Sequence, residues 1–191
     1  MLTIVIPEHP DREYYDETKQ EFVYKPGLPH KQTLQLEHSL ISLSKWEQIW
    51  HIPFLKTSEE GKLTTEQTVS YIKCMTINSN VDPNAYEFID NKMVIEVNKY
   101  ITNPMTATVI YDYSKREGNK ETITNELIYY WMLTAGIPFE CEKWHLNRLI
   151  TLIRICSIKN GKDQNKMSNE EILRRNAALN AKRRAEMKSK G

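Results

Sequence analysis

Apolar side chains recur at helical spacing over residues 122–158, the most strongly patterned part of the chain. The first half of this segment carries Leu127, Ile128, Trp131, Met132 and Ala135. Gly136 followed by Pro138 is typical of a helix end, because proline cannot continue a helix. Glu140 and Glu142 then lie where carboxylates favour the start of a second helix. That helix would carry Leu146, Leu149, Ile150 and Ile153. The pattern predicts two apolar helices folded into an αα-hairpin.

Alternating apolar and polar residues predict strands near the N-terminus. Residues 1–6 and Thr33–Glu37 each have the pattern of a short, half-buried strand. Residues 13–15 and 21–25 flank a polar, turn-like stretch and predict a hairpin. Together these segments indicate a small β-element over residues 1–41.

Capping motifs predict where helices begin in the middle of the chain. In a capping box, a Ser or Thr side chain and the side chain three residues later satisfy free backbone N–H groups. Boxes of this kind occur at Ser44–Glu47 and Thr64–Gln67, and an Asp–Pro start occurs at Asp82–Pro83. Residues 91–102 have helical periodicity, although their β-branched side chains leave a strand open.

The chain becomes strongly polar after residue 158. Residues 159–167 include Gly161 and predict a linker. Ser168 and Glu171 form a further capping box, which opens a helix with few apolar positions. Such a helix buries little surface alone, so we expect it to project from the body or to fray when no partner is bound.

The expected fold is mostly α, of the α+β type. A small β-element over residues 1–41 precedes a helical bundle over 42–158, which ends in the αα-hairpin. A linker over 159–167 and a basic helical arm over 168–191 follow. The length of 191 residues suits one domain with such appendages.

Charge is distributed unevenly along the chain. The net charge is +1, but the segment from residue 159 to the end holds 10 Lys or Arg against 4 Asp or Glu, so the body is acidic. The three cysteines have neither the even number nor the spacing of a disulfide framework. A protein of a reducing compartment is therefore favoured over a secreted domain held together by disulfides. Charged and amide residues interrupt the most apolar run, so we expect no membrane span.

Candidate chemistry is sparse. Cys141 and His145 lie four residues apart and could face one metal ion, but a structural zinc site needs four ligands and no second pair stands at suitable spacing. A buried thiol beside a hydrogen-bonded histidine is the simpler interpretation. The sequence contains none of the phosphate-binding, zinc-protease or calcium-binding motifs. We therefore expect a protein that is not an enzyme and needs no cofactor.

Partner binding is the remaining function, with two groups of candidate residues. Tyr129 and Tyr130 are either hot spots for a partner or part of the core, whereas Trp131 and Trp144 have the spacing of core residues. The second group lies in the arm and consists of Ile172, Arg174, Arg175, Leu179, Lys182, Arg183 and Arg184.

The basic residues of the arm have three interpretations. They could neutralise phosphates, dock on an acidic helical partner, or form a solvated face. Glu170, Glu171 and Glu186 dilute the positive field, and no aromatic residue is interleaved with the basic ones. Nucleic-acid binding is therefore disfavoured.

Several segments resemble the tail assembly chaperones of long-tailed bacteriophages. The resemblance is carried by LQLEHSLISLSKWE (34–47), TVSYIKCMTI (68–77), NKYITNPMTAT (98–108), ITNELIYYWMLTAGIPFECEKWHLNRLITLIRIC (123–156) and MSNEEILRRNAALNAKRR (167–184). It covers most of the chain after about Pro29, and its most distinctive parts are the hairpin and the arm.

The resemblance implies a non-enzymatic role in the host cytoplasm. Proteins of this family bind the long, helix-rich tape measure protein and keep it soluble until tail tube subunits assemble around it, and they are usually absent from the mature virion. Tape measure protein is thus the expected partner, tail tube protein is a second candidate, and self-association stays open. The alternatives are a small nucleic-acid-binding regulator acting through the arm, and a head–tail connector or other virion protein.

Overall fold

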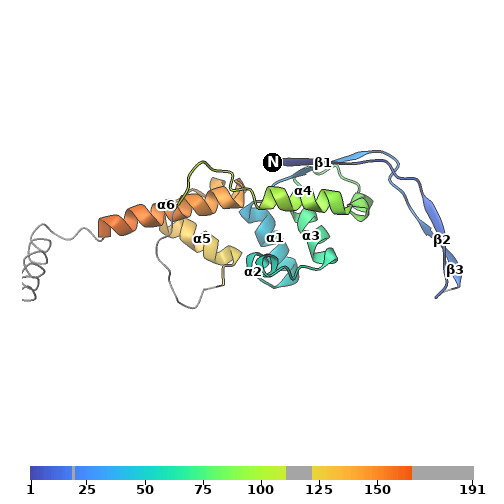
Figure 1. Cartoon of the computed structure of the whole chain (residues 1–191), viewed down its shortest axis with the longest axis horizontal. Helices are drawn as coiled ribbons and strands as arrows, with labels where there is room; N and C mark the ends of the chain where they lie inside the picture. Colours follow the sequence, from blue (N-terminus) through green and yellow to red (C-terminus); the bar gives the residue numbers. More distant parts are fainter. Residues whose placement is uncertain (19, 111–121, 165–191) are drawn as a thin grey trace, which may run out of the picture. The chain divides into compact units, whose positions relative to one another are not determined.

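The computed structural model describes residues 1–18, 20–110 and 122–164. The chain divides into two compact units, Met1–Ile153 and Arg154–Gly191. The elements are β1 (Leu2–Ile6), β2 (Arg12–Asp16), β3 (Glu21–Lys25), β4 (Gln32–Leu36), α1 (Leu40–Trp50), α2 (Phe54–Glu59), α3 (Thr65–Met75), the 3-10 helix η1 (Pro83–Phe88), α4 (Asn91–Ile101), α5 (Asn125–Thr134), the 3-10 helix η2 (Phe139–Lys143) and α6 (Leu146–Gln164) (Figure 1). The fold is mostly helical with a small β-element, as the sequence predicts.

The strands form two separate antiparallel pairs. β1 pairs with β4, so that Ile4 lies opposite Leu34, and β2 pairs with β3 in a hairpin. Alternate residues of the first pair are buried, namely Ile4, Ile6, Leu34 and Leu36. This period of two confirms the predicted strands and gives this pair one face in the core.

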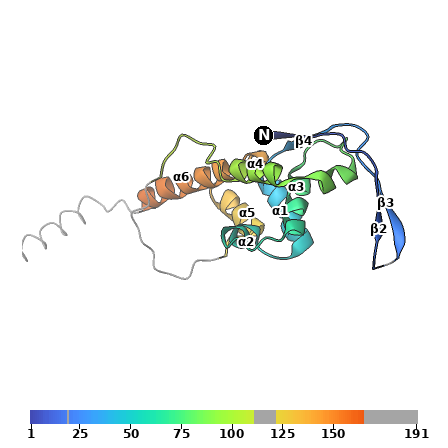
Figure 2. The same ribbon diagram turned by 45° about the vertical axis from the view of Figure 1, so that its right-hand side comes forward.

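Helix α1 occupies the centre of the first unit. Figures 1 and 2 both show it between α3 and α5, and its main helical contacts are with α3, α5, η2 and α2. Trp46 of α1 is fully buried, with the ring of Phe54 edge-on at 5.0 Å, and Phe54 stacks on Tyr71 of α3 at 3.8 Å. This aromatic cluster forms the middle of the core. Of the described helices, none has the length and apolarity needed to cross a membrane.

The start of α1 differs from the prediction. The helix begins at Leu40 rather than near Ser44, because Ser39 is the N-cap. Ser39 Oγ accepts from the backbone N–H of Ser42, and Ser42 Oγ accepts from that of Ser39. The earlier start places Leu40 in the core and leaves the Ser44 hydroxyl free to accept from the side-chain amide of Asn125 at 3.0 Å.

The other helix starts are as predicted. Thr64 and Gln67 form a reciprocal capping box at α3, and Asp82 accepts from the N–H of Asn84 at the start of η1. Asp90 caps α4, so residues 91–101 are helix and not strand.

The predicted αα-hairpin is wrong in its packing. Gly136 does end the first helix with a positive φ of 66°, but η2 follows before α6 begins. Glu140 and Glu142 lie in η2 and not in the first turn of α6. Helix α5 packs mainly against α1 and buries Asn125, Ile128 and Met132.

The predicted linker also differs from the structure at its start. Helix α6 continues to Gln164, since Gly161 weakens a helix by only about 1 kcal/mol and no proline interrupts it. Residues 165–167 and the arm over 168–191 lie outside the described residues.

Candidate partner-binding surface

A cluster of apolar side chains lies exposed on α5 and η2. We define the α5 surface as Tyr129, Tyr130, Leu133 and Phe139. Tyr130, Leu133 and Phe139 are 59%, 61% and 52% exposed. Tyr130 and Leu133 are neighbours at i and i+3, and Tyr129 and Leu133 at i and i+4. The ring of Phe139 lies 6.3 Å from that of Tyr129, so the four side chains form one continuous surface.

Tyr129 is anchored and not free to adapt to a partner. Its hydroxyl donates to Glu142 Oε2 at 2.8 Å. Partial burial, followed by this carboxylate, raises the pKa of Tyr129. The phenol therefore stays protonated and joins α5 to η2, which fixes the position of Phe139.

A buried carboxylate holds the N-terminal end of α5. Glu47 of α1 accepts from the backbone N–H of Asn125 at 2.8 Å and from that of Phe54 at 2.9 Å. It thereby satisfies the first N–H of both α5 and α2. Burial raises the pKa of Glu47, against the effect of these two hydrogen bonds. Glu47 also lines a pocket of about 680 Å³ between the end of α1 and the start of α5.

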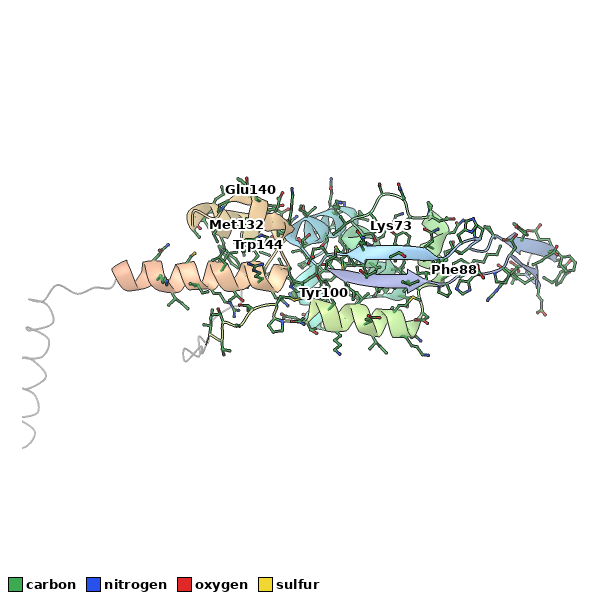
Figure 3. The ribbon with its side chains drawn as sticks, turned by 90° about the horizontal axis from the view of Figure 1, so that it is seen from above. Lys73, Phe88, Tyr100, Met132, Glu140 and Trp144 are labelled. Carbon is green, nitrogen blue, oxygen red and sulfur yellow. The ribbon has the colours of Figure 1, made fainter. Side chains whose placement is uncertain are left out.

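The margin of the α5 surface is polar and partly acidic. Glu126 and Glu140 are exposed beside it. Figure 3 shows Glu140 at the outer side of this segment and Met132, which is fully buried, further in. An apolar centre with acidic residues at its margin is suited to bind an amphipathic, basic partner.

The two predicted tyrosines play different parts. Tyr130 is exposed, as a contact residue must be, whereas Tyr129 is half-buried and hydrogen-bonded. Trp131 and Trp144 are also half-buried, and the guanidinium of Arg148 lies 4.2 Å from the centre of the Trp144 ring. The candidate residues of the arm, from Ile172 to Arg184, lie outside the described residues.

Leu133 and Phe139 were not among the residues predicted to bind a partner. The helical period contained the signal for Leu133, because it lies on the side of α5 away from Ile128 and Met132. The position of Phe139 depends on η2, which the sequence pattern did not predict.

The Cys141–His145 pair forms no metal site in the described residues. Cys141 is buried, while His145 Nε2 donates to the carbonyl of Tyr100 and Nδ1 accepts from the N–H of Asn147. Within residues 1–18, 20–110 and 122–164, no three His, Cys, Asp or Glu side chains are grouped so that they could hold a metal ion. The histidine thus joins α6 to α4.

The chain matches no model of a known protein family, no curated protein and no solved structure.

Proposed function

We propose that this protein is a tail assembly chaperone of a long-tailed bacteriophage. It binds tape measure protein in the host cytoplasm and keeps it soluble while the tail tube assembles. Two features support the proposal: the resemblance in segments between residues 34 and 184, and an exposed apolar surface on α5 and η2 of the kind that a holdase requires.

The observation that carries the proposal is the exposure of Tyr130, Leu133 and Phe139. Side chains at i and i+3 on a helix match the apolar stripe of a second helix lying across them. A helix-rich partner would cover this surface, and its basic residues would meet Glu126 and Glu140. The basic residues of the arm over 168–191 would bind acidic residues of the same partner.

Rigidity also favours this surface as a binding site. Met132 and Ile128 are buried, Glu47 of α1 accepts from the first N–H of α5, and Tyr129 joins α5 to η2. A surface already held in its bound form loses less conformational entropy when a partner docks.

Co-expression with the tape measure protein of the same phage tests the proposal. We expect wild-type chain to raise the soluble fraction of the partner and to co-purify with it. The double variant Tyr130→Ser and Leu133→Ser loses most of this effect, because each lost apolar contact costs about 1.5–3 kcal/mol.

The matched control is Ile95→Ser on α4, where the isoleucine is 68% exposed. This variant removes one apolar side chain that is exposed to a similar extent, and it is expected to retain partner binding. Circular dichroism verifies that all variants are folded. A tape measure protein whose solubility is unchanged by wild-type chain contradicts the proposal, and equal losses in the double variant and the control contradict the site.

A further inference from the structure

The β2–β3 hairpin exposes aromatic residues that the α5 surface does not use. The exposed fractions are 51% for Tyr14, 51% for Tyr15, 71% for Phe22 and 62% for Tyr24. Tyr15 lies directly opposite Phe22, and Tyr24 is two residues further along β3, so these three rings share one face. A two-stranded hairpin with exposed faces is only marginally stable in water.

Only the base of this hairpin is attached to the rest of the first unit. The backbones of His9 and Leu28 exchange hydrogen bonds of 2.9 and 2.7 Å, and Phe88, labelled in Figure 3, stacks on His9 at 4.3 Å. A salt bridge of 2.8 Å joins Lys25 to Glu87. Beyond these contacts, the main contacts of β2 and β3 in the described residues are with each other.

Charges within the hairpin are arranged in like pairs. Arg12 lies opposite Lys25, and Asp16 lies opposite Glu21. Like charges directly opposite each other destabilise a strand pair. On the face that carries these pairs the hairpin is therefore positive at its base and negative near its turn, whereas Glu13 lies on the other face and Asp11 accepts from the hydroxyl of Tyr24. An antiparallel neighbour with the same sequence would place opposite charges together on the first of these faces.

We propose that the free edge of β3 pairs antiparallel with β3 of a second copy of this chain, centred on Val23. This register places Glu21 opposite Lys25 of the second copy at both ends of the contact. It also places Phe22 opposite Tyr24 of the second copy twice, which extends the aromatic face across four strands. The Lys25–Glu87 salt bridge can be exchanged at little cost, because both side chains are about half exposed.

The β2 edge suits the same arrangement less well. Pairing of β2 about Tyr14 would also place Arg12 opposite Asp16 of the second copy, but it would place Glu13 opposite Tyr15, a carboxylate against an aromatic ring. Pairing of β3 combines its complementary charges with two aromatic pairs, which lie on the opposite face of the strand. The inference is independent of the proposed function, since it uses no residue of the α5 surface.

Charge exchange tests the contact in the full-length chain by sedimentation velocity over a concentration series. Glu21→Lys alone places lysines opposite lysines, and Lys25→Glu alone places glutamates opposite glutamates. Each single variant is expected to dissociate about tenfold more readily than wild type. An equimolar mixture of the two variants restores the opposite charges at both ends and is expected to form mixed dimers.

Cysteine cross-linking identifies the edge. In the proposed register Val23 faces Val23 of the second copy, at a separation that a disulfide spans. Val23→Cys should give a covalent dimer on mild oxidation, above the background of wild-type chain, while Tyr14→Cys should not. A monomeric wild type at all concentrations, no recovery in the mixture, or cross-linking only through Tyr14→Cys would overturn the proposal.

Discussion

The buried His38 makes stability depend on pH in a way that can be measured. Its side chain is 1% exposed, its Nδ1 lies 2.6 Å from the hydroxyl of Tyr71, and its ring lies 5.1 Å from that of His145. Burial, together with the neighbouring His145, lowers the pKa of His38 from 6.5 to about 3. The folded protein therefore holds this imidazole neutral at pH values where the unfolded chain binds a proton.

The sign and size of the effect follow from this difference. The contribution of neutral His38 to the free energy of unfolding is fully present above pH 6.5. It is lost as the pH falls from 6.5 toward 3, because only the unfolded chain gains a proton in that range. The loss approaches about 1.4 kcal/mol per pH unit, which gives about 2 kcal/mol between pH 7.5 and pH 5. Burial also lowers the pKa of His145, so its contribution has the same sign.

Urea unfolding at a series of pH values measures the effect. The variant His38→Asn keeps a polar atom near Tyr71 but cannot titrate, so its free energy of unfolding should fall less steeply with acid. The control His30→Asn changes the histidine count equally at an exposed position and leaves the buried site intact. Identical slopes for His38→Asn and wild type between pH 6.5 and pH 5 would refute the reasoning.

Two further predictions concern the elements that support the α5 surface. Leu149→Asp should unfold the chain, because the leucine is fully buried in α6 and an unpaired carboxylate would take its place; Leu149→Ala should cost about 2–5 kcal/mol and remain folded by circular dichroism. A wild-type melting temperature for Leu149→Asp would show that the start of α6 is not core. Glu47→Gln should cost about 1–3 kcal/mol in urea unfolding, because an amide N–H₂ then faces one of two backbone donors, while the exposed Glu59→Gln should have little effect. Equal stability of these two variants would contradict the capping role of Glu47.

Local signals identified most of the secondary structure. The hairpin, the capping box at Thr64 and the helix end at Gly136 all depend on neighbours within a few residues. The strands at 2–6 and 32–36 follow from local alternation of apolar residues, although they pair with each other far along the chain. Hydrogen bonds of that range are encoded where they form, so periodicity and capping residues suffice to find them. The exposure of Tyr130 was open in the sequence, since a tyrosine on an apolar helix suits core and surface alike.

The packing of α5 and the start of α1 were decided only by the tertiary structure, through contacts between residues far apart in the chain. Glu47 caps α5 across 78 residues, and this contact helps to bring α5 onto α1 rather than into a hairpin with α6. Ser39 was preferred to Ser44 as the N-cap because the longer α1 places Leu40 in the core. The capping box predicted at Ser44–Glu47 thus did not begin the helix, because burial of apolar surface and satisfaction of distant backbone N–H groups favoured the earlier start.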